Sequence, residues 1–189
     1  MTSTPSQVAL FGTSADPPTV GHQAIIEWFS QHYEQVAIWA VDNPFKQHQV
    51  SLCDRMAMLG LLIDEVAATN IQLTPEFSDL RTIHSVEKAR QRWGEQTALT
   101  IAIGSDLVDQ IPSWYRSEEL LQSVSFVIVP RPGYQVQPGQ VKQLTTKGAR
   151  IAIADFNAPL ASSSDFRSGH DPSKLAPAVA NYIREAQLY

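Results

Sequence analysis

Ala98–Ile103 (ALTIAI) is a continuous apolar run that Gly104 ends, and this stretch decides the fold class. A second run of the same kind, Ser125–Val129 (SFVIV), stops at Pro130. Neither run alternates polar with apolar residues, and continuous runs of this length are typical of strands that are covered on both faces of a parallel sheet. The two runs therefore predict a parallel sheet that lies between layers of helices.

Short apolar runs and amphipathic segments alternate along the rest of the chain. Further strands are expected at Val8–Phe11, Gln35–Val41, Ile71–Thr74 and Ile151–Ala154. Helices with an apolar face are expected to begin near Gly21, Ser51, Thr82 and Pro177. This order of elements predicts an α/β fold, a single Rossmann-like, doubly wound parallel sheet with helices on both faces. Ligands then belong at the carboxyl ends of the strands.

The chain has 189 residues, a length typical of one domain, so residues 1–189 are expected to form a single domain. The sequence contains no internal repeat and no low-complexity tract. The segment Gly133–Gly148 is polar and rich in glycine and glutamine, and we expect it to be a surface excursion. Cys53 lies in an apolar helical stretch and is expected to be an inert thiol in the core.

Charge and cysteine content exclude several classes of protein. Fourteen Lys and Arg residues against nineteen Asp and Glu residues give a net charge of −5, which argues against general binding to nucleic acid or to anionic membranes. No apolar stretch reaches the ~18 residues of a membrane span, and Met1–Gln7 does not resemble a signal peptide. The single cysteine cannot form an internal disulfide, so the reducing cytoplasm is the expected compartment.

The loop after the first expected strand, Gly12–His22 (GTSADPPTVGH), carries the first candidate site. It matches neither the Walker phosphate-binding loop nor the G-x-G-x-x-G dinucleotide fingerprint. Thr19 is placed to cap the next helix, and His22 falls in the first turn, where free N–H groups favour anions. The residues alone leave two interpretations open: a phosphate site at His22, or a plain helix N-terminus with His22 on the surface.

A resemblance makes the first interpretation specific. Thr19–His22 (TVGH) resembles the [H/T]-x-G-H signature of the nucleotidylyltransferase superfamily, and Asp16-Pro17 stands where that superfamily has its D-P. About 140 residues later, Ser162–Arg167 (SSSDFR) resembles its second signature, I-S-S-T-x-I-R. Further segments, in chain order, are similar to motifs of bacterial nicotinate-nucleotide adenylyltransferases: Asn43–Lys46, Leu80–Ile83, Gly104–Asp106 with Trp114 and Glu119-Leu120, Arg131–Gly133, and Val179–Tyr189. The ordered set spans nearly the whole chain.

The reaction that this resemblance implies is adenylyl transfer. The phosphate of nicotinic acid mononucleotide attacks the α-phosphorus of ATP, giving nicotinic acid adenine dinucleotide and pyrophosphate, a step of NAD biosynthesis. A phosphate monoester with a second pKa near ~6 is already mostly a dianion at pH 7, so no general base is needed. The site then has to align two polyanions and spread their charge, which calls for cations and N–H donors.

The resemblance also implies the site residues. His22 would donate to the α-phosphoryl oxygens, Thr19 would offer a hydroxyl, and Arg167 would hold the departing pyrophosphate; these three are the expected catalytic residues. ATP binding is assigned to Gly12, Thr13, Thr19, His22, Gly104, Asp106, Ser163, Ser164 and Arg167. Mononucleotide binding is assigned to Lys46, Thr82, Trp114 and Arg131. No protein metal site is expected, because Mg²⁺ would be bound mainly by the ATP phosphates and water.

Four positions depart from the family pattern and keep alternatives open. Thr13, Ala15 and Thr19 stand where the family usually has Gly, Phe and His, and Asp165 adds a negative charge to the second signature. Thr at position 19 is familiar from pantetheine-phosphate adenylyltransferase of coenzyme A biosynthesis, which is the main alternative, and a non-catalytic nucleotide sensor is a second. The preference for nicotinic acid or nicotinamide mononucleotide, and the formation of a homo-oligomer, also stay open.

Overall fold

The computed structural model describes residues 4–43, 46–131, 133–156 and 159–189. Its strands form one six-stranded parallel sheet in the order β3-β2-β1-β4-β5-β6. They are β1 (Gln7–Thr13), β2 (Gln35–Ala40), β3 (Ile71–Leu73), β4 (Ala98–Gly104), β5 (Ser125–Val129) and β6 (Arg150–Ile153). The predicted α/β class and the predicted parallel sheet are confirmed.

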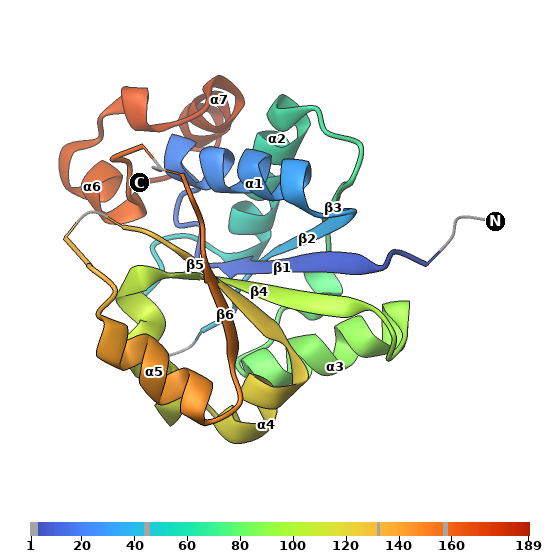
Figure 1. The fold of residues 1–189 in the computed structure, drawn as a ribbon. Helices are drawn as coiled ribbons and strands as arrows, with labels where there is room; N and C mark the ends of the chain where they lie inside the picture. The colour runs from blue at the N-terminus through green and yellow to red at the C-terminus, as the bar shows by residue number, and fades with distance from the viewer. Residues whose placement is uncertain (1–3, 44–45, 132, 157–158) are drawn as a thin grey trace.

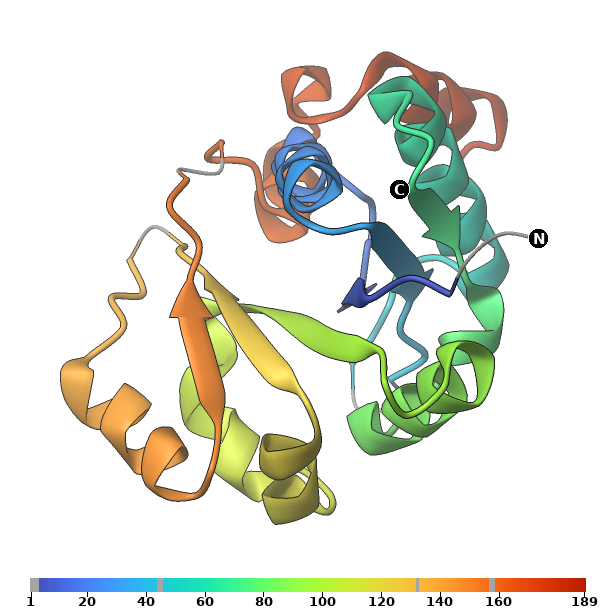
Figure 2. The same cartoon turned by 45° about the vertical axis from the view of Figure 1, so that its right-hand side comes forward.

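Helices cover both faces of the sheet (Figures 1 and 2). The upper layer in Figure 1 holds α1 (Val20–His32), α2 (Leu52–Val66), α6 (Ser163–Gly169) and α7 (Pro177–Glu185). The lower layer holds α3 (Thr82–Trp93), α4 (Ser117–Ser123) and α5 (Pro138–Thr146). Short 3₁₀ helices lie at η1 (Pro75–Phe77), η2 (Ser105–Ser113) and η3 (Pro172–Lys174). No helix in the described ranges is long and apolar enough to cross a membrane.

Successive residues of the central strands enter different cores, which explains the continuous apolar runs. In β1, Ala9 and Phe11 join the core beneath α1 and α2. Val8 and Leu10 join the core beneath α3 and α4. All four side chains are buried. Because both faces of such a strand are covered, neither face needs polar residues and the sequence pattern loses its alternation.

The segment Gly133–Gly148 is more regular than its composition suggested. It contains α5, which begins at Pro138 after the cap residue Gln137, whose backbone N–H donates to Gln140 Oε1 at 2.6 Å. The segment lies mainly at the surface, as predicted, but its helix was not predicted. The reason is that α5 buries a single side chain, Leu144, so the apolar periodicity that identifies a helix is missing.

The position of Cys53 and two short helices differ from what the sequence predicted. Cys53 is exposed and does not lie in the core. It occupies the first turn of α2, whose buried face runs through Arg55, Met58 and Leu59, so an apolar neighbourhood in sequence did not mean burial in space. The short helices η2 and α4 were not predicted, because segments of seven to nine residues carry too few apolar positions to reveal a period.

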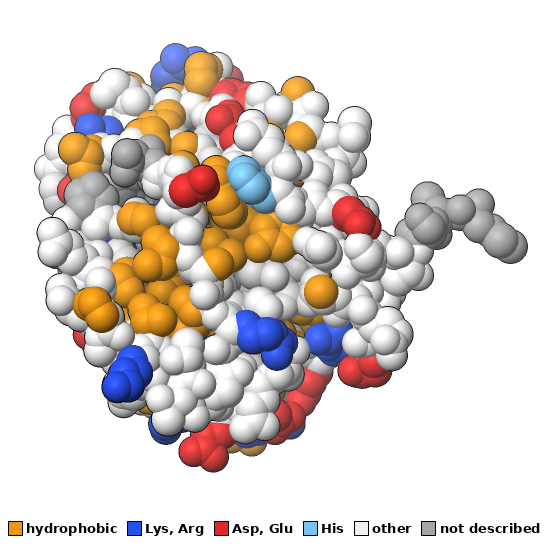
Figure 3. All heavy atoms as spheres, viewed as in Figure 1, with side chains coloured by type: hydrophobic (Ala, Val, Ile, Leu, Met, Phe, Trp, Pro, Cys, Tyr) orange, Lys and Arg blue, Asp and Glu red, His pale blue; other side chains and the backbone are white. Residues whose placement is uncertain are grey.

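The edge strand β6 leaves apolar surface open. Its residue Ile153 is 53% exposed, and Trp28 of α1 stacks on Phe156 beyond β6 with ring centroids 5.7 Å apart. Figure 3 shows apolar side chains gathered on this face of the molecule. The strands nearer the middle of the sheet are almost fully buried by comparison.

The strand order reverses direction between β1 and β4, and this reversal fixes where a ligand belongs. From β1 the chain continues through β2 and β3 towards one edge of the sheet, whereas β4 leads through β5 and β6 towards the other. The connections that leave β1 and β4 therefore diverge at the carboxyl ends of these two neighbouring strands. In open α/β sheets this switch point is where ligands bind.

A buried arginine fastens the loop that leaves β1. Arg55 of α2 is 1% exposed, and its Nη1 donates to the carbonyl oxygens of Ser14 at 2.8 Å and Val41 at 2.9 Å. Desolvation lowers the pKa of this guanidinium, and the nearby Asp16 acts in the opposite direction. The arginine thus joins the loop after β1 to the segment after β2.

A glycine permits the closest approach between distant segments. A Cβ atom on Gly21, in the first turn of α1, would lie 2.7 Å from the carbonyl oxygen of Ala161. That oxygen belongs to the backbone and cannot move aside like a flexible side chain. The start of α1 and the segment before α6 can therefore pack together only if residue 21 has no side chain.

Gly21→Ala is expected to lower the free energy of unfolding by roughly 1–3 kcal/mol, because the added methyl group overpacks a backbone contact. Gly60→Ala is the matched control: it also lies inside a helix, but its Cβ would meet only Leu73 Cδ2 at 3.7 Å. There the higher helix propensity of alanine is expected to stabilise the protein by about 0.5–1 kcal/mol. Urea unfolding measures both values, and equal signs for the two variants would contradict the packing argument.

Candidate active site

His22 lies at the start of α1 with its imidazole buried against the loop that leaves β1. The residue is only 7% exposed, so the interpretation of a surface histidine is excluded. The backbone N–H of Thr19, the N-cap residue, donates to Nδ1 at 3.1 Å. Because Nδ1 accepts this bond, the proton of the neutral ring sits on Nε2. Nε2 lies 3.0 Å from Oγ1 of Thr13, the last residue of β1.

The imidazole is electrically neutral at physiological pH. Burial lowers the pKa of His22 to about 4, and the positive charge of Arg131 adds to the effect. His22 therefore offers a polar N–H group instead of a positive charge. A neutral donor at a helix N-terminus still favours anions, because the free N–H groups of the first turn supply partial positive charge there.

The segment around α6 packs directly on the loop that carries His22. Thr19 Oγ1 donates to the carbonyl oxygen of Ala161 at 2.7 Å. Ser163 Oγ donates to the carbonyl oxygen of Pro17 at 2.8 Å, and Arg167 Nη1 donates to that of Asp16. The two signatures, which are about 140 residues apart in sequence, are thus neighbours in space.

Asp165, one of the four departures from the family pattern, has a structural role at the start of α6. The backbone N–H of Ser162 donates to Asp165 Oδ2 at 3.2 Å, and the backbone N–H of Asp165 donates to Ser162 Oγ at 3.1 Å. This reciprocal pair is a capping box at the start of α6. The bonds from Ser162 lower the pKa of Asp165. The extra negative charge therefore stabilises a helix N-terminus.

A second group of predicted residues meets beyond the ends of β4 and β5. Arg131 Nη1 lies 3.2 Å from Asp106 Oδ2, and the backbone N–H of Arg131 donates to Ser105 Oγ at 2.9 Å. A Cβ atom on Gly104 would collide with the Asp106 carboxylate and come within 2.8 Å of Arg131 Nε. Within the described residues, Asp106 Oδ1 is buried without a hydrogen-bond partner. Because residue 104 is glycine, the Asp106 carboxylate fits here, and its Oδ1 can still accept a hydrogen bond from a ligand.

Arg131, which the sequence assigned to mononucleotide binding, lies beside an expected ATP-binding residue. Its guanidinium pairs with Asp106, and its positive charge contributes to the low pKa of His22. Lys46, from the mononucleotide set, is exposed, and its Nζ donates to Ser14 Oγ at 3.1 Å on the first loop. Lys46 thus joins the segment after β2 to the first loop.

Thr82 and Trp114 lie on adjacent elements in the lower layer. Thr82 is the first residue of α3, and Trp114 directly follows η2 and packs against the core beneath α3 and α4. Their neighbours in sequence are in contact, because the guanidinium of Arg81 lies 5.0 Å from the ring centroid of Tyr115. Pro44, Phe45 and Pro132, which take part in the motif matches, lie outside the described residues.

Three residues of the site region were given no role in the site by the sequence, although Asp16 and Tyr189 lie in segments that match the family. Asp16 is 3% exposed and accepts from the backbone N–H of Gln49 at 3.0 Å and from the Tyr189 hydroxyl at 2.8 Å. The guanidinium of Arg55 donates a hydrogen bond to the Ser14 carbonyl oxygen. Arg55 could have been suspected, because it is a charged residue on the apolar face of an expected helix. No pattern in the residues around Tyr189 indicates its contact with Asp16, which is 173 residues away in sequence.

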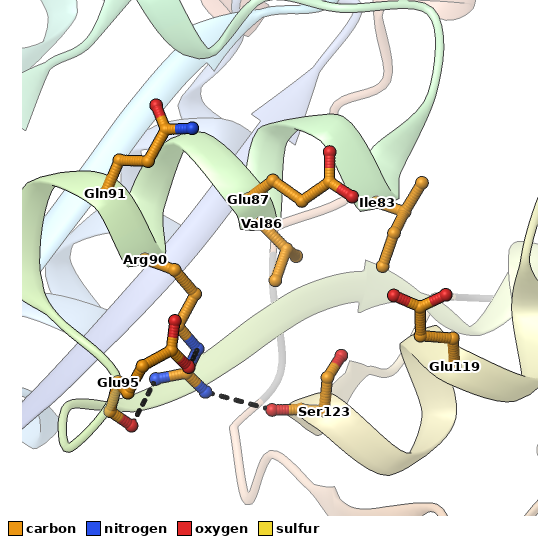
Figure 4. A pocket seen from close by; sticks show the side chains of 8 residues that line it. All are labelled: Ile83, Val86, Glu87, Arg90, Gln91, Glu95, Glu119 and Ser123. Atoms are coloured by element: carbon orange, nitrogen blue, oxygen red, sulfur yellow. Dashed lines mark hydrogen bonds and ion pairs between the residues drawn. The ribbon is translucent and has the colours of Figure 1, made fainter.

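A groove elsewhere on the surface holds none of the predicted site residues. It has a volume of about 380 Å³ and is lined by residues of α3 and α4, among them Glu87, Arg90 and Glu119 (Figure 4). Arg90 donates to the carbonyl oxygens of Glu95 and Ser123, at 3.1 Å and 3.0 Å, so its charge serves the fold. Across the part of the chain that the structure describes, no three or more His, Cys, Asp or Glu side chains gather to hold a metal.

Comparison with known proteins places the chain. A family model described as cytidylyltransferase-like matches residues 10–169. A probable nicotinate-nucleotide adenylyltransferase of Synechocystis sp. is 41% identical over 97% of this chain and 98% of its own. One of Bacillus cytotoxicus is 29% identical, covering 97% and 98%.

The solved structure of Plasmodium falciparum nicotinic acid mononucleotide adenylyltransferase complexed with NaAD shares the fold, with a TM-score of 0.80 at 17% identity and 96% coverage of both chains. The family match covers both signatures and the loop that bears His22, and the Synechocystis relative covers nearly the full length. The chain therefore belongs to the cytidylyltransferase-like family and, within it, to the nicotinate-nucleotide adenylyltransferases.

Proposed function

We propose that this chain transfers the adenylyl group of ATP to nicotinic acid mononucleotide in NAD biosynthesis. A phosphate oxygen of the mononucleotide forms a bond to the α-phosphorus, and the bond between the α-phosphorus and the bridging oxygen breaks. Pyrophosphate leaves with the electron pair, and nicotinic acid adenine dinucleotide remains. The named relatives carry out, by their printed names, the same class of reaction.

One observation carries the proposal: His22 and Arg167 converge on a single loop at the switch point of the sheet. The imidazole faces Thr13 at the end of β1, and the guanidinium contacts Asp16 three residues further along the chain. This arrangement supports a phosphate chain that runs from the first turn of α1 towards the start of α6. Along this path the described residues offer hydrogen-bond donors and the permanent positive charge of Arg167, which suits anions.

His22 is proposed to act as a neutral hydrogen-bond donor. Its Nε2–H would leave the Thr13 hydroxyl for an oxygen on the α-phosphorus, where negative charge builds up in the transition state. The attacking phosphate is already a dianion, so no proton has to move at His22. A low pKa therefore does not impair the proposed role, because the donor form is the one that persists at physiological pH.

The residues of α6 are proposed to hold the pyrophosphate. Ser164 is exposed, and its Oγ lies 3.2 Å from Arg167 Nη2, so hydroxyl and guanidinium are aimed at the same space. Ser163 fixes the start of α6 on the first loop through Pro17. ATP is proposed to enter with Mg²⁺ on its phosphates, and the ion would neutralise part of their charge.

Asp106 and Arg131 are proposed to bind the rest of ATP. The unpartnered Oδ1 of Asp106 can accept from a ribose hydroxyl, as acidic residues at strand ends often do. On the acceptor side, we propose that Lys46 neutralises the mononucleotide phosphate, and that Trp114 and Thr82 contact the pyridine ring and its carboxyl group. The reducing cytoplasm fits this reaction and the lone, exposed cysteine.

The direct experiment measures pyrophosphate release from ATP by the purified chain. Three acceptors are compared under identical conditions: nicotinic acid mononucleotide, nicotinamide mononucleotide and phosphopantetheine. The expected result is the highest kcat/KM for nicotinic acid mononucleotide. Turnover of phosphopantetheine alone would reassign the chain to the coenzyme A pathway, and ATP binding without any turnover would indicate a nucleotide sensor.

His22→Ala is expected to lower kcat by about 10²–10³-fold, because a donor aimed at developing charge is lost. His22→Asn keeps a neutral donor and is expected to retain more activity than His22→Ala. Steady-state kinetics at saturating ATP measure both variants. If His22→Ala turned over at the wild-type rate, the imidazole would have no part in the reaction.

The buried histidine also predicts a pH dependence of stability. The pKa of His22 is about 4 in the folded chain and 6.5 in an unfolded one, so between these values the unfolded chain binds a proton that the folded chain does not. Stability from this group is complete above pH 6.5 and falls by about 3 kcal/mol as the pH drops to 4. Urea unfolding at both pH values measures it. His22→Asn should lose correspondingly less, and identical losses would contradict the assignment.

Arg167→Lys tests whether the planar guanidinium is needed beyond its charge. Lysine retains the positive charge but cannot bind phosphate with two parallel hydrogen bonds, so kcat/KM for ATP is expected to fall about 10–100-fold. Arg184→Lys on the exposed side of α7 is the matched control and should keep wild-type kinetics. Equal kcat/KM values for the two variants would remove Arg167 from the phosphate site.

A further inference from the structure

Asp16 lies between the loop after β1 and the guanidinium of Arg167. Its side chain is 4% exposed, and both carboxylate oxygens are occupied by neutral donors. Oδ1 accepts from the Tyr189 hydroxyl at 2.8 Å, and Oδ2 accepts from the backbone N–H of Gln49 at 3.0 Å. The carboxylate is thus held in one orientation from two sides.

Arg167 and Asp16 do not form a close ion pair between their side chains. The nearest approach, from Nη1 to Oδ2, is 3.8 Å. Nη1 donates to the main-chain carbonyl of Asp16, and Nη2 donates to Ser164 Oγ at 3.2 Å. A carboxylate this near a guanidinium would gain from two parallel hydrogen bonds at 2.7–2.9 Å, a typical distance for charged pairs. The bonds from Tyr189 and Gln49 oppose that rearrangement.

Tyr189 is well placed to hold the carboxylate. Its ring packs edge-on against Phe166, the residue before Arg167, with centroids 5.7 Å apart. The last described residue of the chain accordingly lies beside α6 in Figure 1. Burial, followed by the bond to Asp16, raises the pKa of the Tyr189 hydroxyl, so it remains protonated and donates.

We propose that Tyr189 is a positioning residue for the phosphate-binding arginine: its hydroxyl keeps the Asp16 carboxylate off Arg167, so that the guanidinium stays available to the phosphates of ATP. Asp16 and phosphate are both anionic acceptors that suit the same planar donor. A bond that holds the Asp16 carboxylate away from Arg167 therefore strengthens the binding of phosphate to Arg167. The proposal rests on the proposed function only in naming ATP as the phosphate ligand.

Tyr189→Phe removes the hydroxyl but keeps the ring on Phe166. Asp16 Oδ1 then loses its donor, and the carboxylate turns towards Arg167. The KM for ATP and the Kd for inorganic pyrophosphate are expected to rise about tenfold, in line with the loss of one hydrogen bond to a charged group. The KM for the mononucleotide and kcat at saturating ATP are expected to change less than twofold.

Tyr182→Phe is the matched control. Its hydroxyl also donates to a carboxylate, Asp54 Oδ1 at 3.0 Å, but this bond joins α7 to α2 and involves neither Asp16 nor Arg167. Both variants lose one tyrosine hydroxyl bonded to an aspartate, so losses in melting temperature should be similar. The rise in KM for ATP is expected only for Tyr189→Phe. A rise in both, in proportion to the loss of melting temperature, would show a purely structural effect and overturn the proposal.

A double-mutant cycle with Asp16→Asn tests whether the Asp16 carboxylate competes with phosphate for Arg167. Asparagine carries no charge and cannot pair with Arg167 as an ion, so adding Tyr189→Phe to Asp16→Asn should leave the Kd for pyrophosphate unchanged. A tenfold rise in that background as well would overturn the proposal. Calorimetry with pyrophosphate needs no turnover. An inactive wild-type chain that nevertheless shows this cycle would therefore reject the proposed function and keep the role of Tyr189.

Discussion

The contact between the start of α1 and the segment before α6 is the constraint on which the site depends. Thr19 donates its hydroxyl to the Ala161 carbonyl, and the absence of a side chain at Gly21 lets the two backbones meet. Together with the bonds from Ser163 and Arg167 to the first loop, this contact brings the imidazole of His22 and the guanidinium of Arg167 to one surface. Because the first loop leaves β1 at the switch point of the sheet, the contact forms where open α/β sheets bind their ligands.

The region around this contact is not a simple cluster of positive charges. The chain has a net charge of −5, and burial keeps His22 neutral, so attraction for anions comes from Arg167, Arg131 and the N–H groups of the first turn. Aspartates are close to both arginines: Asp106 pairs with Arg131, and Asp16 stands near Arg167. The guanidiniums are thus partly compensated before any ligand arrives, and a ligand must compete with internal carboxylates.

Sequence patterns predicted the parallel sheet, the helix starts near Gly21, Thr82 and Pro177, and the pairing of the two signatures, because apolar runs and short motifs are local. They failed for α5, whose single buried Leu144 gives no period, and for exposed Cys53, because neighbours in sequence do not decide which face of α2 is covered. The neutral state of His22 and the roles of Asp16 and Tyr189 depend on burial and long-range contacts. No pattern within a few residues contains that information.

Buried Arg55 carries a consequence for the evolution of the chain. Its side chain is desolvated beneath the first loop, and one face of its helix is otherwise apolar. Replacement of buried charged groups by well-packed apolar ones is often neutral or favourable for stability. At position 55, however, methionine or leucine would leave the carbonyl oxygens of Ser14 and Val41 without their donor. Each buried acceptor that loses its partner costs about 1–3 kcal/mol, so a screen for heat resistance is expected to retain arginine here, as a screen for activity would.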